Sequence, residues 1–212
     1  MHRSRTLLIS ITAIVAVAAG MLAARAFVDT SSQSPALAKA TLLTPPRPLP
    51  EFELEDHAKA VFDRARLRDH WSLLFFGFTR CPDICPTTLG ALAQVEKSLS
   101  DLPKDQRPQI VLISVDPRRD TPEQLASYVK FFSSSFLGVT GTQQATDALT
   151  LALGVPVAMH RDPNSVSEDD YTVDHSAAIF LVDPHGALRA LFSTPHAPAV
   201  IAADYRRIVA NG

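Results

Sequence analysis

Residues 71–89 read WSLLFFGFTRCPDICPTTL, and this stretch decides the fold. Its first part, residues 71–78, is a short and nearly continuous apolar run, which is typical of a central strand covered on both faces. The two cysteines follow at once. Residues 86–99 then place apolar side chains such as Leu89 and Leu92 at helical spacing. The predicted local order is therefore strand, loop and helix, with the cysteines in the loop.

Strands and helices alternate along the rest of the domain. The predicted elements are a short hairpin over residues 52–62, a strand over 110–115, helices over 122–132, 142–153 and 198–209, and a hairpin over 177–192. Residues 121–124, Thr-Pro-Glu-Gln, match a capping box with proline at the first helical position. Asp-Pro-His-Gly at 183–186 is typical of a hairpin turn. This order predicts an α/β sandwich with a mixed central sheet, which is compatible with a thioredoxin-like fold.

The N-terminus is predicted to anchor the chain in a membrane. Residues 7–24 form an apolar run of 18 residues without a charge, and Arg3 and Arg5 precede it. At about 1.5 Å per residue the run spans roughly 27 Å, close to the hydrocarbon thickness of a bilayer. The arginines favour an N-terminus that stays in the cytoplasm. A cleaved signal peptide is the alternative, because Ala-Arg-Ala at 24–26 offers a small-x-small site.

Both alternatives export the domain. The first residues lack the long Arg- and Ser-rich amphipathic helix of a mitochondrial presequence, so we expect a bacterial inner membrane with the domain facing the periplasm. The expected organisation is a cytoplasmic N-terminus over residues 1–6, a transmembrane anchor over 7–24, a flexible Pro- and Ser-rich linker over 25–49, and the folded domain over 50–212.

Composition excludes several classes of protein. With 212 residues, of which 46% are hydrophobic and 20% charged, the chain suffices for one packed domain and an appendage. A formal net charge of -2, with no basic cluster interleaved with aromatics, argues against a nucleic-acid partner. Two cysteines exclude a disulfide-stapled mini-protein and a four-cysteine zinc or iron–sulfur site made by one chain. A disulfide between them would close a very short loop and stabilise the fold by roughly 2 kcal/mol or less, which favours a chemical role.

The cysteines lie in Cys-Pro-Asp-Ile-Cys-Pro, residues 81–86. Because proline disfavours helical geometry in the residue before it, we expect the helix to begin at Pro86, with Cys85 as its N-cap. There the helix dipole would stabilise a thiolate. Two thiolates are soft ligands that suit Cu(I), and an imidazole would complete a trigonal site. By itself the Cys-x-x-x-Cys spacing leaves metal binding and a redox pair open.

Seven histidines could supply the imidazole. His175 is the best placed of them, because it directly precedes the strand expected from about residue 177, and Asp174 beside it could orient or charge-balance the ring. The alternative is an ordinary loop or surface histidine, which is also the simplest interpretation of His160 next to Met159.

Three blocks of the sequence resemble one known family. Residues 74–89 closely resemble the signature of the Sco/SenC family, copper proteins of cytochrome c oxidase assembly. Residues 113–122, ISVDPRRDTP, are similar to its second motif, and residues 170–178, DYTVDHSAA, to its histidine motif. The resemblance extends from about Pro50 to the C-terminus.

From the residues themselves, Asp174 is expected to support the His175 ring, and Asp83 is expected either to cap the helix or to tune the sulfurs. The resemblance implies a thioredoxin-like domain on an N-terminal anchor, with Cys81, Cys85 and His175 as copper ligands. It implies a metallochaperone and not an enzyme. The protein would take copper from an upstream periplasmic donor and deliver it to the binuclear copper site of an oxidase subunit. The ion is expected to be Cu(I), and binding of Cu(II) as well stays open. The alternative is a thiol–disulfide reductase that keeps the subunit's cysteines reduced through its own cysteine pair.

Two features depart from the family pattern. Arg80 stands where the family often has histidine, and the glycine expected in the early hairpin after Asp56 is missing. Asp116 and Arg119 are assigned no catalytic role, because Asp-Pro after a strand is ordinary turn chemistry.

Overall fold

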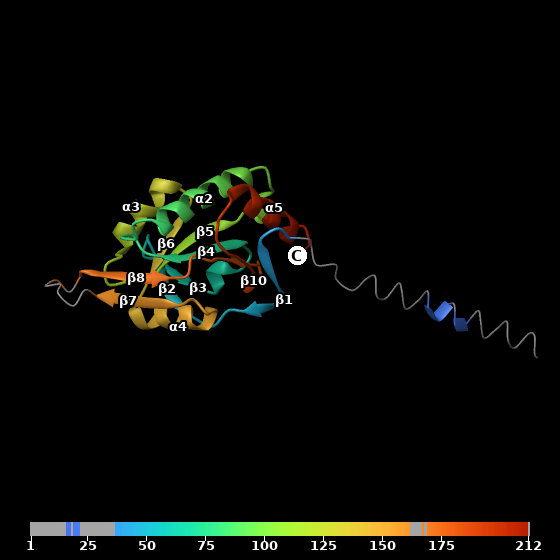
Figure 1. Ribbon diagram of the computed structural model, residues 1–212, viewed down its shortest axis with the longest axis horizontal. Coiled ribbons are helices and arrows are strands. Elements are labelled where there is room, and N and C mark those ends of the chain that lie inside the picture. Colours follow the sequence, from blue (N-terminus) through green and yellow to red (C-terminus); the bar gives the residue numbers. More distant parts are fainter. Residues whose placement is uncertain (1–15, 18, 22–36, 162–166, 168, 212) are drawn as a thin grey trace, which may run out of the picture. The chain divides into compact units, whose positions relative to one another are not determined.

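The centre of the domain is an eight-stranded sheet with strand order β1-β10-β9-β4-β5-β6-β2-β3. The computed structural model describes residues 16–17, 19–21, 37–161, 167 and 169–211 (Figure 1). The strands are β1 Ala40–Pro48, β2 Glu53–Asp56, β3 Val61–Asp63, β4 Ser72–Gly77, β5 Gln109–Ser114, β6 Leu137–Thr140, β7 Val157–Arg161, β8 Tyr171–His175, β9 Ile179–Val182 and β10 Ala187–Phe192. The helices are α2 Ile84–Ser98, α3 Pro122–Phe132, α4 Gln143–Leu153 and α5 Pro198–Val209, with 3-10 turns η1 Ala65–Leu67 and η2 Lys104–Gln106.

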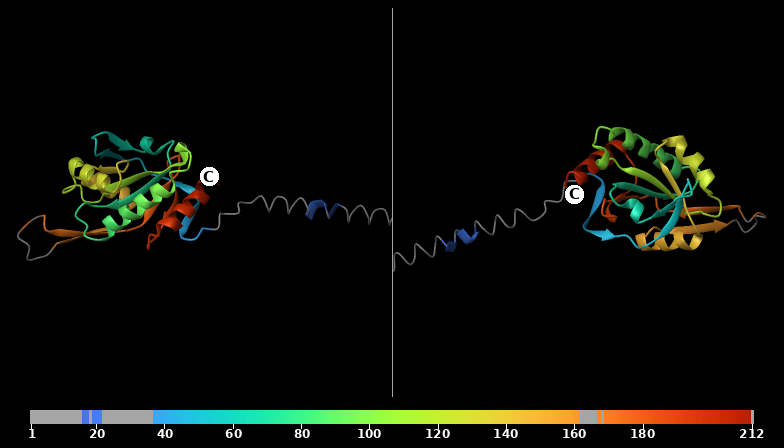
Figure 2. Two further views of the ribbon diagram at one scale, coloured as in Figure 1. Left: turned by 90° about the horizontal axis from the view of Figure 1, so that it is seen from above. Right: turned by 180° about the vertical axis from the view of Figure 1, so that it is seen from behind.

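The sheet is mixed. Strands β4, β5 and β6 run parallel to one another. Next to β4, strand β9 is antiparallel, and β10 is antiparallel to β9. Next to β6, strand β2 is antiparallel. Helices α2, α3 and α5 cover one face, and α4 lies on the opposite face (Figures 1 and 2). The structure thereby confirms the predicted α/β architecture with a mixed central sheet. The predicted hairpin around Gly186 is present as β9–β10, and this glycine has a φ of 74°.

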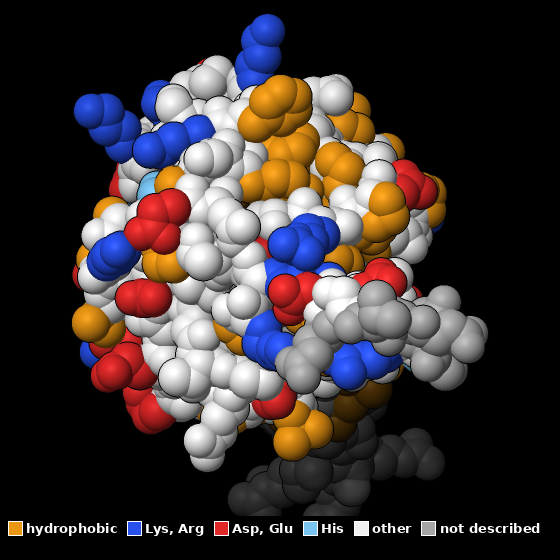
Figure 3. Space-filling model, turned by 90° about the vertical axis from the view of Figure 1, so that its left-hand side faces the viewer, with side chains coloured by type: hydrophobic (Ala, Val, Ile, Leu, Met, Phe, Trp, Pro, Cys, Tyr) orange, Lys and Arg blue, Asp and Glu red, His pale blue; other side chains and the backbone are white. Residues whose placement is uncertain are grey.

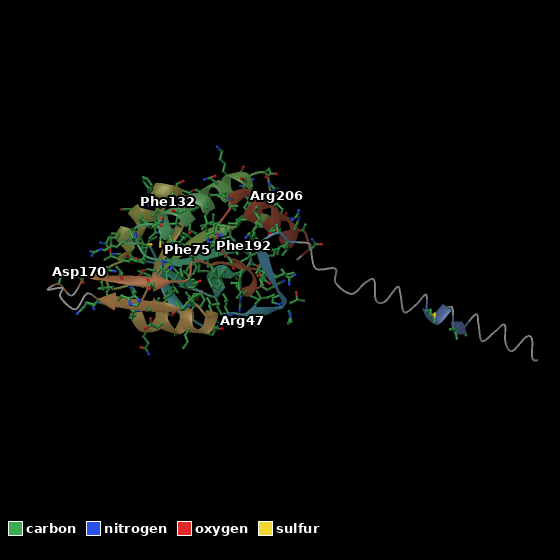
Figure 4. The ribbon with its side chains drawn as sticks, in the orientation of Figure 1. Arg47, Phe75, Phe132, Asp170, Phe192 and Arg206 are labelled. Atoms are coloured by element: carbon green, nitrogen blue, oxygen red, sulfur yellow. The ribbon has the colours of Figure 1, made fainter. Side chains whose placement is uncertain are left out.

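Strand β4 lies in the middle of the sheet and is buried over its whole length. Its side chains are buried on both faces of the sheet, which explains why the run is apolar without alternation. Phe75 is fully buried and lies in the interior of the domain (Figure 4). The strand ends at Gly77, and the turn that follows it contains the cysteines. The buried strand therefore gives the cysteine turn a rigid support.

Residues 40–48, assigned to the flexible linker by the sequence analysis, form a strand instead. Strand β1 pairs antiparallel with β10, and one compact unit begins at Leu37. Prolines are tolerated here because β1 is an edge strand, and the register shifts between Leu42 and Arg47 where they occur. The buried carboxylate of Asp204 on α5 also accepts hydrogen bonds from three backbone N–H groups at residues 38–40.

The early hairpin β2–β3 is present without the glycine that its turn was expected to need. Lys59 takes the left-handed conformation, with a φ of 63°. The carboxylate of Asp56 accepts hydrogen bonds from the backbone N–H groups of Ala58 and Ala60, at 2.9 and 3.0 Å, and so holds the turn closed. An aspartate that caps its own turn therefore replaces the missing glycine.

The strained turn at Lys59 leads to a stability prediction. Lys59→Gly and Lys59→Ala both remove the exposed ion pair with Glu123, but only glycine takes a positive φ without a steric cost. We expect the glycine variant to have a thermal midpoint about 2–4 °C above that of the alanine variant. Differential scanning calorimetry of the two proteins measures the difference. Equal midpoints would mean that the turn relaxes away from the left-handed conformation.

Strands β7 and β8 form a separate two-stranded sheet that extends from the domain (Figures 1 and 2). His160 therefore lies on a strand and not in the loop that we expected. In β8 Tyr171 and Val173 are buried, while Thr172 and Asp174 are exposed. This period-two alternation is the signal that sequence reasoning passed over.

Most of the predicted anchor, residues 7–24, lies outside the described residues. Residues 16–17 and 19–21 are helical. Within the described part of the chain, no helix combines the length and the apolar character needed to span a membrane.

Candidate metal centre

The two cysteines occupy the connection between β4 and α2. The backbone N–H of Cys81 donates to the carbonyl of Phe78, which folds the chain back just after the strand. Cys81 is partly exposed. Cys85 is fully buried among the core residues.

Helix α2 begins earlier than predicted. Its N-cap is Asp83 and its first residue is Ile84, so Cys85 lies inside the first turn and is not the N-cap. The reason is that the first four N–H groups of a helix have no partner within it, so Pro86 at the third position removes no hydrogen bond. The first helical hydrogen bond runs from the N–H of Thr87 to the carbonyl of Asp83.

The pKa of the Cys85 thiol is raised, whereas we expected a stabilised thiolate with a lowered pKa. Burial raises its pKa, and the neighbouring Cys81 and Asp120 raise it further, against the lowering effect of a backbone hydrogen bond at Phe78. Without a metal ion, Cys85 therefore carries its proton at neutral pH. A cation bound at the sulfur would replace this proton.

His175 is the last residue of β8 and its ring reaches Cys85. Its Nε2 lies 3.2 Å from Cys85 Sγ, and its Nδ1 lies 3.0 Å from the carbonyl oxygen of Ser176. Because a carbonyl only accepts, Nδ1 carries the proton and Nε2 presents its lone pair to the sulfur. Burial lowers the pKa of His175, so the ring is neutral at pH 7 and is ready to bind a metal.

Aromatic rings hold the imidazole on two sides. The His175 ring meets those of Phe75 and Phe78 edge-on, with centroid distances of 6.0 and 5.8 Å. Phe75 lies on β4, and Phe78 follows directly after the strand, shortly before the cysteines. The apolar strand therefore also forms a wall of the site.

The sulfurs of Cys81 and Cys85 and a ring nitrogen of His175 all lie within 4.8 Å of one another. Metal–sulfur bonds of about 2.3 Å and metal–nitrogen bonds of about 2.0 Å, as in zinc sites, place the donors of one trigonal ion roughly 3.5–4 Å apart. The observed triangle needs only small side-chain movements to match this spacing. Two soft sulfurs and one imidazole suit Cu(I).

The site opens to the surface. A cavity of about 510 Å³ is lined by Cys81, His175 and their neighbours on the cysteine turn and on β8. Figure 3 views the end of the molecule where the β7–β8 hairpin projects, and hydrophobic side chains gather on its upper part beside charged ones. A partner protein can therefore approach the donors from outside.

The predicted supporting acids do not contact the donor atoms. Asp174 is exposed, and its carboxylate pairs with His160 Nε2 at 2.9 Å, so it acts on His175 only through space. The His175 ring is oriented by the hydrogen bond that its Nδ1–H donates to the carbonyl of Ser176. Asp83 stands at the N-cap of α2, where its carboxylate accepts from the hydroxyl of Thr87 at 3.4 Å.

Sequence reasoning missed Gly77, which makes room for the sulfur. A Cβ at this position would lie 2.8 Å from Cys85 Sγ, closer than such contacts occur. The available signal was a glycine inside an otherwise apolar strand, which often marks a close approach of another group. Asp116 and Arg119 were interpreted as ordinary turn residues, whereas the structure buries both of them together with Asp120.

The comparisons with known proteins decide the family. A sequence profile described as SCO1/SenC matches residues 42–210. The chain belongs to the SCO1/SenC family. The match of this SCO1/SenC protein begins at residue 42, within β1, whereas the resemblance was expected to begin near Pro50.

Individual relatives agree with this assignment. A protein of Stutzerimonas stutzeri named for copper binding is 41% identical over 160 residues, which are 74% of this chain and 75% of that protein. The mitochondrial SCO2 homologue of Bos taurus is 38% identical over 160 residues, or 76% of this chain and 59% of the bovine protein. The crystal structure of yeast Sco1 with copper bound is similar with a TM-score of 0.71 at 30% sequence identity. The match covers 79% of this chain and 91% of the yeast chain.

Proposed function

We propose that this protein is a copper metallochaperone, which binds one copper ion through Cys81, Cys85 and His175 and delivers it to the binuclear copper site of cytochrome c oxidase during assembly. The observation that carries the proposal is the meeting of two sulfurs and one imidazole nitrogen within 4.8 Å beside a surface cavity. Membership of the SCO1/SenC family supports this choice of client.

The chemistry of the donors suits transfer of a cargo ion. Three soft or borderline donors leave Cu(I) with a free direction, and an incoming ligand of the acceptor can bind before a donor leaves. Cys81 is the partly exposed sulfur, so it is the donor that an acceptor ligand meets first. Cys85 is fully buried, and together with the neutral ring of His175 it holds the ion while the ligands exchange.

The proposed location is the inner membrane of a bacterium, with the copper domain in the periplasm. The support is the uncharged run over residues 7–24 behind Arg3 and Arg5. Copper would arrive from a periplasmic donor. Expression in spheroplasts with external protease tests this topology, because only a periplasmic domain is cleaved there.

A thiol–disulfide reductase is the second candidate function. Both cysteines are free thiols, and their sulfurs lie within 4.8 Å, close enough to oxidise together. The burial of Cys85, which raises its pKa, makes this sulfur a poor nucleophile. Attack on a partner disulfide would therefore have to begin at Cys81.

One experiment separates the two functions. Full-length protein in detergent, loaded anaerobically with one equivalent of Cu(I), is mixed with the metal-free soluble domain of an oxidase copper-site subunit, and copper is assayed in both after separation. A chaperone transfers the ion to the reduced acceptor. A metal-free protein that instead reduces the oxidised acceptor, while the loaded one transfers nothing, would favour the reductase and exclude the chaperone.

Copper binding should depend on pH in a defined direction. Because the pKa of Cys85 is raised, its thiol is protonated across the neutral range, and the ion must displace that proton. We expect the apparent association constant for Cu(I) to rise about tenfold or more per pH unit between about pH 6 and pH 8. The lowered pKa of His175 means that proton competition at the ring adds to this slope only at lower pH. Competition titrations at three pH values measure the slope, and a flat profile would contradict a protonated Cys85.

A further inference from the structure

The charged residues at positions 116, 119 and 120 form a buried cluster between the cysteine turn and the strand that carries His175. Asp116, Arg119 and Asp120 are each at most 7% exposed. The cluster follows β5, the neighbour of the strand that ends at the cysteine turn. So many buried charges behind a single strand exceed what a simple turn requires.

Arg119 binds the strand that carries His175. Its Nη1 donates to the backbone carbonyls of Asp169 and Tyr171, at 2.9 and 3.0 Å. Its guanidinium lies flat over the Tyr171 ring, with Cζ 3.6 Å from the ring centroid. Asp116 completes this clamp, because its carboxylate accepts both from Arg119 Nε and from the Tyr171 hydroxyl.

Asp120 binds the turn that carries the cysteines. Its carboxylate accepts from the backbone N–H and the hydroxyl of Thr79, at 3.1 and 2.6 Å, two residues before Cys81. The hydroxyl of Ser114, at the end of β5, donates to the same carboxylate at 2.7 Å. One short loop thus holds the cysteine turn on one side and β8 on the other.

The β7–β8 hairpin needs such a support. Among the described strands, β7 and β8 pair only with each other, so no backbone ladder ties β8 to the main sheet. Its position depends on buried side chains and on the hydrogen bonds that reach it from Arg119. His175 is four residues beyond Tyr171 on the same strand.

We propose that Arg119 is a positioning residue of the copper site, which fixes β8 so that the His175 imidazole stands over the sulfur pair. The inference rests on the proposed function for its consequence, namely that the third ligand is lost when the clamp is loosened. Asp116 and Tyr171 orient the guanidinium, and Asp120 holds the cysteine turn in place through Thr79. Lysine cannot replace arginine here, because an ammonium lacks the planar fork that reaches a carboxylate and two carbonyls at once.

The test compares Arg119→Lys with the wild type in full-length protein, alone and combined with His175→Ala. Cu(I) affinity is measured by anaerobic competition, and the nitrogen ligand by X-ray absorption spectroscopy. We expect Arg119→Lys to lower the affinity about tenfold and to remove the nitrogen signal while both sulfurs remain. In the His175→Ala background it should change the affinity less than about twofold, because the ligand that it positions is already gone.

Arg206→Lys is the matched control, since Arg206 also holds a backbone carbonyl and a carboxylate, but on α5. It should leave copper binding unchanged. An Arg119→Lys protein with wild-type affinity and nitrogen signal, or with the same loss in both backgrounds, would overturn the inference. A wild type that binds no copper would instead sink the proposed function.

A metal-free measurement keeps the inference testable in every case. Amide hydrogen exchange over residues 171–175 should be at least about tenfold faster in Arg119→Lys than in the wild type, and unchanged in Arg206→Lys. Tyr171→Phe, which removes only the hydroxyl donor to Asp116, should give a smaller change in the same residues if the arginine variant is too unstable to purify. Unchanged exchange in both variants would disprove the positioning role.

Discussion

Replacing Cys85 with serine is expected to lower the affinity for Cu(I) by roughly a thousandfold or more, equivalent to about 4 kcal/mol of binding free energy. The reason is that a hydroxyl neither ionises at neutral pH nor offers the soft sulfur that Cu(I) prefers. The fold should survive, because serine is slightly smaller and its buried hydroxyl can hydrogen-bond to Nε2 of His175, the partner that Cys85 contacts now.

We expect the sulfurs to contribute more to the affinity than the imidazole among the three proposed ligands. Cys81→Ser removes the other sulfur and should cost a similar factor, with less effect on stability because Cys81 is partly exposed. His175→Ala leaves two sulfurs and should cost only about 10–100-fold. Anaerobic competition with a Cu(I) chelator gives the affinities, and circular dichroism checks the fold.

An exposed histidine provides the control. His160 lies on β7, and its ring pairs with Asp174 on the surface. His160→Ala should bind copper as the wild type does. A His160→Ala protein that loses affinity while Cys85→Ser retains it would show that copper sits on the hairpin and not at the sulfur pair.

The local order around the cysteines was predictable because it follows from the chain's own pattern. The apolar run of β4 and the helical spacing of α2 each report burial within a few residues. The capping box at Thr121 and the turn at Gly186 are equally local, and the structure confirms both. The helix start was wrong by two residues, because proline in a first helical turn is compatible with more than one boundary.

The meeting of His175 with the cysteines could not be derived from local pattern. The two sides lie 90 residues apart in the sequence, and the ring is brought in by a hairpin outside the main sheet. Its position before a strand made His175 the best placed histidine, but the resemblance to a family was needed to join it to the cysteines. Strand β7 was missed for a related reason, because most of its side chains are exposed and show no apolar alternation.

Residues 40–48 illustrate a different limit. Their prolines argue against a central strand, but an edge strand with a shifted register accepts them. What fixes this segment is distant, namely the carboxylate of Asp204 on α5, whose pKa is lowered by the backbone N–H groups at residues 38–40 even though burial opposes the shift. No pattern within the segment announces such a partner.

Gly77→Ala is expected to destabilise the domain by about 1–3 kcal/mol and to weaken copper binding at least about tenfold. The added Cβ would lie 2.8 Å from Cys85 Sγ, 3.1 Å from Phe75 Cε1 and 3.2 Å from Leu112 Cδ1. The two apolar side chains are fully buried, so neither can yield freely. The sulfur should therefore move, and with it the 3.2 Å approach to His175 Nε2.

Gly90→Ala is the matched control, because it adds the same methyl group where nothing lies within 4 Å. Gly90 is inside α2, so alanine should raise the stability by up to about 1 kcal/mol and leave the affinity unchanged. If Gly77→Ala lost stability but bound copper as tightly as the wild type, the strand and not the sulfur would have yielded. The glycine would then serve only the packing of β4. A joint loss of stability and affinity would instead mean that the strand interior and the ligand sphere share one tightly packed contact.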